Sequence, residues 1–123
     1  MSDSSGQSLR AVGPYTPIVR AGGWLICSGQ VGLADGKLVD GGVAAEVTQA
    51  VANLDALLRS EGASLASVMK TSVFLADIGE YGAMNEAYIA AFNDHRPARS
   101  AFAVAGLPLG ARVEIEAWAW IGQ

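Results

Sequence analysis

Charged side chains are scarce in this chain of 123 residues, of which 16% are charged and 51% hydrophobic. This composition excludes a disordered chain, because disordered segments are rich in charge and poor in apolar residues. Long hydrophobic runs are missing as well. The longest run, residues 87–92, is far shorter than the roughly 20 residues that a helix needs to cross a bilayer. We therefore expect one small globular domain over residues 1–123, with no membrane partner.

Cysteine and histidine occur once each, as Cys27 and His95. One cysteine cannot form a disulfide within the chain, and no His, Cys and carboxylate side chains have the spacing of a metal site, so we expect no metal. Cys27 lies in an apolar stretch, which indicates a small core residue. His95 follows a predicted helix, where a structural role is favoured over a catalytic one. Nucleotide-binding and nucleophile-elbow motifs are also missing, which disfavours nucleotide, flavin and acyl-enzyme chemistry.

Basic residues are few, and they are scattered along the chain. Lys and Arg number 8 against 12 Asp and Glu, which gives a net charge of −4. Proteins that bind nucleic acids normally carry clustered Lys and Arg, so we expect no nucleic-acid partner. Residues 1–8 are small and polar, lack the layout of a signal peptide, and are expected to be frayed. Together with the single cysteine, these features favour the cytoplasm.

Short stretches of β-favouring residues between turn signals predict strands, and helical spacing of apolar residues predicts two helices. The strands are expected at 18–21, 24–28, 33–39, 68–76, 100–105 and 112–121, and the helices at 43–61 and about 80–94. Gly22-Gly23 and Asp35-Gly36 are typical of hairpin turns, while Gly62 and Pro97 are expected to stop the helices. This order predicts an α+β fold: a mixed sheet of about six strands with two helices on one face.

The last predicted strand has two unlike faces. The face expected to pack against the helices holds Val113, Ile115, Ala117, Ala119 and Ile121. The opposite face, expected to be open, holds Arg112, Glu114, Glu116, Trp118 and Trp120. The same alternation in the strand at 68–76 places on one face Met69, Thr71, Val73 and Leu75. Two tryptophans on an open sheet face favour an oligomer whose subunits cover them; the alternative is that they cover each other as surface aromatics.

Three polar positions next to turns and strand ends could carry chemistry. Arg99 follows the second predicted helix, and its two-pronged guanidinium suits a carboxylate or phosphate; the alternative is a surface or salt-bridge arginine. Glu114 lies on the open strand face, where it needs a partner or partial protonation; a structural ion pair with Arg112 or Lys70 is equally open. Ser28-Gly29-Gln30 ends a predicted strand in a glycine turn, where hydroxyl and backbone N–H groups can reach a ligand.

Several short stretches together carry a family resemblance. They are Gly13-Pro14-Tyr15, Ser28-Gly29-Gln30, Val68-Met69-Lys70-Thr71-Ser72-Val73-Phe74-Leu75, Asn85-Glu86-Ala87-Tyr88, His95-Arg96-Pro97-Ala98-Arg99-Ser100, Val104-Ala105-Gly106-Leu107-Pro108 and Val113-Glu114-Ile115-Glu116-Ala117. Each stretch alone is a weak signal, but their order and spacing are highly specific. Over nearly its full length the sequence resembles the RidA family, also called the YjgF or L-PSP endoribonuclease-like family.

The resemblance implies a chorismate-mutase-like α+β fold and a homotrimer. In this family the sheets of three subunits form a central β-barrel with the helices outside, and clefts between subunits hold the ligand. The implied activity is the hydrolysis of short-lived 2-enamino and 2-imino acids, such as 2-aminoacrylate, to 2-oxo acids and ammonia. Family members need neither a metal nor an organic cofactor, so the resemblance implies none here.

The resemblance also assigns site residues. Arg99 matches the arginine that grips the substrate carboxylate, and Glu114 matches the acid that orients the attacking water. The matched substrate-binding positions are Tyr15, Ser28, Gly29, Asn85 and Pro108. The chain departs from the family pattern at Ala101, where several members have a cysteine, and at Thr16-Pro17.

Two other functions stay open at this point. The chain could be a non-catalytic module, chaperone-like or specific for carboxylates such as 2-oxo acids, that uses the same cleft between subunits. It could also be an endoribonuclease, the activity behind the older family name. The acidic composition, the single histidine and the scattered basic residues argue against the endoribonuclease.

Overall fold

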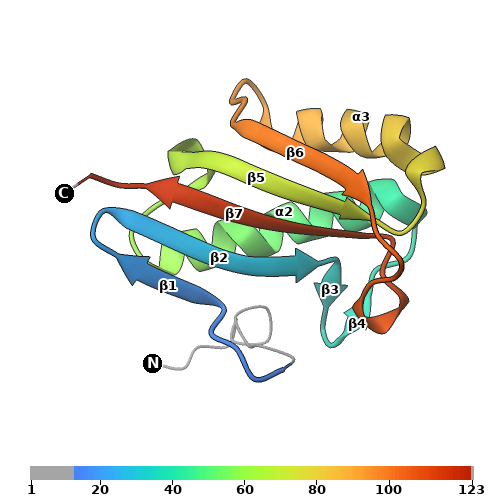
Figure 1. Cartoon of the computed structure of the whole chain (residues 1–123), viewed down its shortest axis with the longest axis horizontal. Helices are drawn as coiled ribbons and strands as arrows, with labels where there is room; N and C mark the ends of the chain where they lie inside the picture. The colour runs from blue at the N-terminus through green and yellow to red at the C-terminus, as the bar shows by residue number, and fades with distance from the viewer. Residues whose placement is uncertain (1–12, 123) are drawn as a thin grey trace.

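The computed structural model describes residues 13–122, in which five strands form one mixed sheet (Figure 1). The strands lie in the order β1 (Ile18–Ala21), β2 (Trp24–Val31), β7 (Val113–Trp120), β5 (Val68–Leu75) and β6 (Ala98–Ala103). Neighbouring strands are antiparallel except β5 and β6, which are parallel. The predicted α+β fold class is confirmed. The predicted fraying of residues 1–8 lies outside the described residues.

Both long helices, α2 (Gly42–Ser60) and α3 (Tyr81–Phe92), cover the same face of the sheet (Figure 1). Their apolar stripes supply buried residues to a core that the sheet completes from the other side. The largest fully buried side chains include Leu54, Leu57 and Leu58 of α2, Met84 of α3, and Leu25, Leu75 and Ile115 of the sheet. Cys27 lies in this core, as predicted, and burial raises the pKa of its thiol to about 12. Within residues 13–122, no helix combines the length and hydropathy that crossing a membrane requires.

Both predicted hairpin turns are present, but the second one leaves the main sheet. Asp35 and Gly36, with φ angles of 55° and 82°, connect β3 (Leu33–Ala34) to β4 (Lys37–Leu38), and these strands pair only with each other. The side-chain amide of Asn53 on α2 donates to the carbonyl oxygens of Val31 and Leu33. These bonds occupy backbone acceptors where β2 ends and β3 begins. The main sheet therefore has five strands, and the prediction of about six counted a hairpin that stands apart.

Two β-bulges correct the predicted faces of the strands. In β5, the pairing shifts between Val68 and Lys70, so that Met69 is the extra residue and is 52% exposed, whereas the other residues predicted on its face, Thr71, Val73 and Leu75, are buried. In β2, three residue steps from Cys27 to Gln30 oppose two steps on β7. The strand thus continues to Val31 and does not stop at Gly29 as predicted. A bulge re-aims the side chains next to it, which hydrophobic alternation alone does not indicate.

Element ends also differ from the prediction by a few residues. The second helix begins and ends inside its expected range: the short 3₁₀ turn η2 (Ile78–Glu80) precedes α3, and Asn93, with φ 55°, ends the helix well before Pro97. β6 begins at Ala98 because it pairs in parallel with β5 from that residue on. β7 ends at Trp120, so Ile121 is exposed instead of facing the helices. Two further 3₁₀ turns are η1 (Leu65–Ser67) and η3 (Pro108–Gly110).

The sheet face opposite the helices is open in this chain and carries large apolar side chains. On β7 the predicted alternation is confirmed from Val113 to Trp120: the helix side is fully buried, while Trp118 and Trp120 are 41% and 43% exposed. Trp24 packs edge-on against both tryptophans, with ring centroids 6.1 and 5.1 Å apart. Further exposed apolar residues include Val19, Met69 and Phe102. The tryptophans contact one another through Trp24 and still leave a large apolar surface.

Candidate active site

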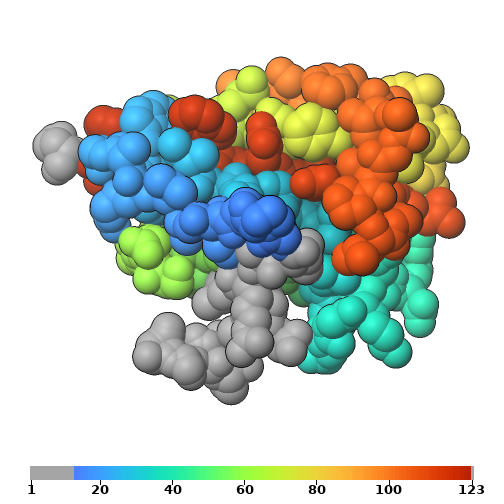
Figure 2. Space-filling model, turned by 60° about the horizontal axis from the view of Figure 1, so that its bottom comes forward, coloured from blue at the N-terminus to red at the C-terminus, as the bar shows by residue number. Residues whose placement is uncertain are grey.

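The predicted site residues fall into two separate hollows of opposite charge. The acidic hollow, of about 330 Å³, is lined by Tyr15, Ser28, Gly29, Pro108, Glu114 and Glu116. The basic hollow, of about 290 Å³, is lined by Asn85, Tyr88, Ile89, Arg96, Pro97 and Arg99. In Figure 2 the dark-blue residues before β1 and the orange residues before β7 lie on either side of the region that contains the acidic hollow. Of the seven predicted site residues, five therefore line the acidic hollow, and the other two, Asn85 and Arg99, line the basic hollow.

Glu114 lies in the acidic hollow because of the bulge in β2. It faces the open side of the sheet, between Val31 of β2 and Phe74 of β5 in register. The bulge brings Gly29 so close that an added Cβ at Gly29 would lie 2.1 Å from Oε2 of Glu114. The Glu114 carboxylate thus packs directly over the Gly29 backbone, an approach that only glycine permits.

Ser28 connects β2 to the segment that carries Tyr15. Its hydroxyl donates to the carbonyl oxygen of Thr16 at 2.7 Å, and its backbone N–H donates to that of Pro17 at 2.8 Å. These bonds hold Tyr15 at the rim of the acidic hollow, where its side chain is exposed. The Ser28 hydroxyl thus positions the Tyr15 segment by this bond while Ser28 also lines the acidic hollow.

Glu114 has no ion-pair partner among residues 13–122, so the predicted alternative of a salt bridge to Arg112 or Lys70 is wrong for this chain. Burial raises the pKa of its carboxyl above the usual value, and the nearby negative charge of Glu116 raises it further. Both effects disfavour the charged form. A half-buried carboxyl of this kind is suited to accept and return a proton closer to neutral pH than an ordinary glutamate.

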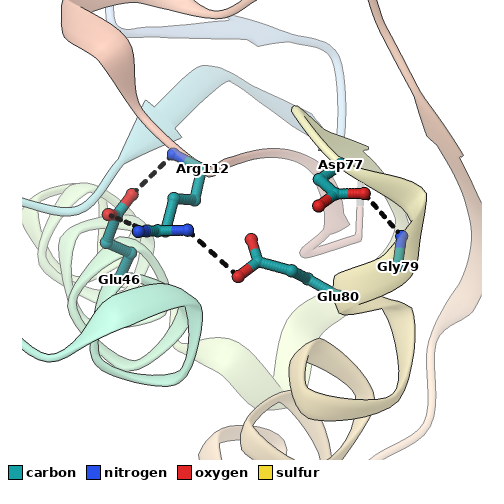
Figure 3. A network of polar contacts seen from close by, with 5 residues as sticks. All are labelled: Glu46, Asp77, Gly79, Glu80 and Arg112. Atoms are coloured by element: carbon teal, nitrogen blue, oxygen red, sulfur yellow. Dashed lines mark hydrogen bonds and ion pairs between the residues drawn. The ribbon is translucent and has the colours of Figure 1, made fainter.

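Arg112 points toward the helices and not, as predicted, to the open face (Figure 3). Its guanidinium contacts Oε2 of Glu80 at 3.1 Å and Oε2 of Glu46 at 3.9 Å, and its backbone N–H donates to Oε1 of Glu46 at 2.8 Å. Glu46 on α2 is only 5% exposed, and a buried carboxylate requires such partners. This network fixes Arg112, which directly precedes β7 and lies two residues before Glu114. Beside it, the Asp77 carboxylate accepts from the Gly79 N–H and caps η2.

In the basic hollow, the guanidinium of Arg99 is held by aromatic side chains of α3. Arg99 pairs with the buried Thr71 of β5, which puts its side chain on the helix side of the sheet. Its Nη2 donates to the Tyr81 hydroxyl at 3.0 Å, and its Cζ lies 4.9 Å from the Tyr88 ring centroid. The Tyr88 hydroxyl is fixed in turn by Oγ1 of Thr71 at 2.7 Å. Such cation–π contacts orient the guanidinium and leave donors free for an anion.

Asn85 contributes to the lining of the same hollow. Its Oδ1 is buried and has no hydrogen-bond partner among the described residues. A buried amide oxygen without a partner is costly, and an N–H group of a ligand would satisfy it. Arg99 likewise has no carboxylate within 4 Å among residues 13–122, so the alternative of a salt-bridge arginine is not realised. The basic hollow can thus accept a small anion that also carries an N–H group.

Arg99 and Glu114 do not meet within one chain. Arg99 lies on β6, the edge strand of the sheet, and its side chain is on the helix side. Glu114 lies two strands away on β7, on the open side. The sheet itself separates the two side chains. Of the remaining reactive side chains, His95 binds the Val68 carbonyl oxygen through Nε2 at 2.6 Å, a structural contact as predicted. The described residues contain no group of three or more His, Cys, Asp or Glu placed to hold a metal.

A family model described as Endoribonuclease L-PSP matches residues 5–121. The chain belongs to this family. A Mus musculus relative named 2-iminobutanoate/2-iminopropanoate deaminase is 45% identical over 116 residues, which span 93% of this chain and 86% of the relative. The predicted resemblance to the RidA, YjgF or L-PSP family is thereby confirmed.

Two crystal structures of L-PSP family relatives agree closely with this chain. RidA from the Antarctic bacterium Psychrobacter sp. PAMC 21119 has a TM-score of 0.86 and 36% identity, with 91% of this chain and 92% of the relative covered. E. coli TdcF with bound serine has a TM-score of 0.82 and 30% identity, with 89% and 90% covered. At these identities, the backbone that carries both hollows is that of the family.

Three polar residues of this L-PSP family chain line the basic hollow or hold its arginine without having been predicted as site residues: Tyr81, Tyr88 and Arg96. A signal for the two tyrosines is present in the sequence, because Tyr81, Met84 and Tyr88 recur at helical spacing on one face of α3. The spacing indicates a shared face, but not that this face meets Arg99. Arg96 precedes Arg99 by three residues in an irregular segment, for which periodicity indicates no direction.

Proposed function

We propose that the protein hydrolyses 2-imino acids, and the 2-enamino acids from which they form, to 2-oxo acids and ammonia without a cofactor. The observation that carries this proposal is a pair of oppositely charged hollows, one with an oriented guanidinium and one with a half-buried, unpaired carboxyl. The name of the Mus musculus relative supports the same activity, and the serine bound to E. coli TdcF supports an amino-acid-like ligand.

Arg99 is proposed to bind the substrate carboxylate through its two-pronged guanidinium. Tyr81 and Tyr88 hold that guanidinium in place, so less freedom is lost when the substrate binds. Oδ1 of Asn85 is available to accept from the N–H group next to the reacting carbon. The remaining substrate-binding residues, Tyr15, Ser28, Gly29 and Pro108, form the wall around Glu114.

Glu114 is proposed to orient and deprotonate the attacking water. An enamine first gains a proton at carbon and loses one from nitrogen, which converts it to the imine. Water then adds to the imine carbon: the new C–O bond forms, the C=N π electrons move to nitrogen, and the water's proton passes by way of Glu114 to that nitrogen. The hydroxyl proton of the resulting amino alcohol then passes by way of Glu114 to nitrogen, the C–N bond breaks, ammonia leaves, and the C=O bond of the 2-oxo acid forms. A carboxyl with a raised pKa is suited to carry the proton in both directions.

We propose that the complete site forms between subunits of a homotrimer whose open sheet faces build a central barrel. The two hollows lie on different sides of the sheet, so a second copy is needed to bring a basic hollow to an acidic one. The exposed Trp118 and Trp120 support burial of the open face. Closure of identical subunits around a threefold axis repeats the same contact three times.

The activity is tested with imines generated in the assay by an L-amino-acid oxidase, with semicarbazide trapping whatever is not hydrolysed. We expect the protein to reduce semicarbazone formation, and Arg99→Ala to lower kcat/KM about 100-fold or more, as expected for two lost charge-assisted hydrogen bonds. Arg59→Ala is the matched control, because Arg59 pairs on the surface of α2 with Asp55.

Two results contradict the proposal. An Arg99→Ala rate equal to that of the unmodified protein would remove Arg99 from the site. Saturable binding of a 2-oxo acid without any turnover would instead support the non-catalytic binding module.

We also propose that the protein works in the cytoplasm. Its only cysteine is a buried core residue that forms no disulfide within the chain, as suits a reducing compartment. Cell fractionation followed by immunoblotting tests this location, and recovery in an organelle fraction would contradict it.

A further inference from the structure

The structure assigns a second anion-binding residue to the basic hollow. We propose that Arg96 binds a second carboxylate of the substrate, so that the site favours imino acids with two carboxylates. This inference rests on the proposed function, because it names the substrate class of the same site. It is carried by a juxtaposition: Arg96 and Arg99, the two arginines without an acidic partner among the described residues, line one hollow.

The pairing of the arginines shows how unusual this hollow is. Arg20, Arg59 and Arg112 each contact a carboxylate oxygen, at 3.2, 2.9 and 3.1 Å. In a chain with 12 acidic and 8 basic side chains, acidic partners are plentiful. Arg96 and Arg99 nevertheless have none within residues 13–122, and no acidic residue lines their hollow. Two neighbouring guanidinium groups repel each other, and an anion with two charges would offset that repulsion.

Arg96 is held in place before any ligand binds. Its Nη1 donates to the carbonyl oxygens of Asn93 and His95, the former in the left-handed residue that ends α3. Its Nε and Nη2 donate to no described residue. The guanidinium is therefore positioned by one nitrogen while donors on the other two stay free. A pre-positioned donor set loses little freedom on binding, which favours a carboxylate over bulk water.

The positive charges of Arg96 and Arg99 both act on the hydroxyl of Tyr88, which lines the hollow. Burial raises the pKa of Tyr88, whereas its hydrogen bond with Thr71 and the charges of Arg99 and Arg96 oppose this rise. A substrate whose first carboxylate lies on Arg99, above the Tyr88 ring, is thus within the field of Arg96 as well. The hollow, at about 290 Å³, has the size of a site for a small molecule. A short chain between two carboxylates suits these dimensions.

Two other roles of Arg96 are conceivable on the same contacts. Its bonds to Asn93 and His95 could serve only to close the end of α3. Alternatively, a carboxylate of a second copy, such as Glu116 in the acidic hollow, could occupy its free donors in the assembled protein. Both alternatives predict that loss of the Arg96 charge affects all substrates alike. A second-carboxylate site predicts that it affects diacids selectively.

The experiment compares Arg96→Gln with the unmodified protein on two imines generated in the assay, one from alanine and one from glutamate. We expect the ratio of kcat/KM for the diacid imine to that for the monoacid imine to fall about tenfold or more in Arg96→Gln. Arg96→Lys, which keeps the positive charge but loses the two-pronged guanidinium, should restore part of this ratio. Arg59→Gln is the control and should leave the ratio unchanged, because Arg59 lies outside both hollows.

A binding measurement keeps this inference separable from the proposed function. Titration calorimetry with 2-oxoglutarate and 2-oxobutanoate should show a preference for the diacid that Arg96→Gln abolishes, whether or not imines are hydrolysed. An Arg96-dependent diacid preference without imine hydrolysis would overturn the proposed function alone. An equal loss for both ligands, or a ratio unchanged in Arg96→Gln, would overturn the second-carboxylate site. The melting temperature shows whether Arg96→Gln is folded. If Arg96→Gln is not folded, the same comparison is made with Arg96→Lys.

Discussion

The acidic and basic hollows belong to the same sheet and hold two charged side chains each, but they are built by different means. The acidic hollow is built by the backbone: a bulge places Gly29 beneath Glu114, and Ser28 ties in the Tyr15 segment. The basic hollow is built by side chains, with Tyr81 and Tyr88 holding Arg99. In the acidic hollow, burial and the nearby charge of Glu116 raise the pKa of Glu114. The basic hollow presents the cationic donors of Arg96 and Arg99 to an anion.

This difference indicates how the two hollows complement each other. A substrate carboxylate needs fixed cationic donors, whereas the attack of water needs a carboxyl that can hold and release a proton. Placing both groups side by side in one chain would let Arg99 form an ion pair with Glu114 and lower the pKa of that carboxyl. Separation by the sheet prevents Arg99 and Glu114 from pairing within one chain. The comparison therefore gives a physical reason for a site shared between subunits.

The largest expected effect tests whether the hollows come from different copies. Arg99→Ala and Glu114→Gln should each be inactive alone, because each lacks one half of the site. Co-expressed as mixed trimers, they should regain about a third of the unmodified rate, since one of the three sites in each trimer that contains both variants then joins an intact Arg99 to an intact Glu114 from another copy. The measurement is the imine-hydrolysis rate of doubly tagged, purified mixed oligomers.

The control replaces the Glu114→Gln partner by the double variant, which has no intact half to contribute and should leave the mixture inactive. No recovery in the first mixture would mean that the two residues do not work across subunits. It would then require a large rearrangement within each chain, because the sheet separates them.

The next effect concerns the acidic hollow alone. Gly29→Ala puts a Cβ where Oε2 of Glu114 lies, so the carboxylate must move while the strand pairing can persist. We expect kcat/KM to fall about 100-fold, within the usual contribution of a general base, with a melting temperature close to that of the unmodified protein. Gly106→Ala is the control, since no atom of residues 13–122, apart from Gly106 and its chain neighbours, lies within 4 Å of a Cβ there. A fully active Gly29→Ala would contradict the packing of Glu114 on Gly29 as a requirement for catalysis.

Much of the fold could be predicted because local pattern and tertiary structure agree. The alternation from Val113 to Ala119 reports a strand with one buried face, and the apolar stripe of α2 reports a helix on that face. The hairpin at Gly22 needs only the positive φ that glycine adopts freely. In each case the residues that decide the structure are close neighbours in sequence.

The features that could not be predicted depend on distant partners. Met69 is turned to solvent by a bulge that exists only in the pairing with β7, and Arg112 is drawn to the helix side by Glu46. The candidate site shows the same limit. Seven of the residues that line the two hollows follow from the resemblance, but their division between two sides of the sheet follows from strand order and register. The contact between Arg99 and Tyr81 joins β6 to α3 and has no signal in local periodicity.

The smallest expected effect concerns the pKa of Glu114 in the acidic hollow. If Glu114 is the base, kcat/KM must decrease as pH falls through its pKa, because protonation removes the reactive form. Burial and Glu116 raise that pKa, so the decrease should begin at a higher pH than for an ordinary glutamate, with its usual value of 4.5. Glu116→Gln removes the neighbouring negative charge, and the midpoint of the decrease should then move to lower pH by less than about one unit.

The midpoint in Glu116→Gln should still lie above that of an exposed glutamate, because burial is the larger cause and the substitution leaves it in place. Glu61→Gln is the matched control: it removes a carboxylate that pairs with Arg20 and lines neither hollow. The measurement is the pH dependence of kcat/KM on one imine for all three proteins. A midpoint that stays in place or rises in Glu116→Gln would mean that the titrating group is not Glu114, and it would assign the proton transfer to another part of the shared site.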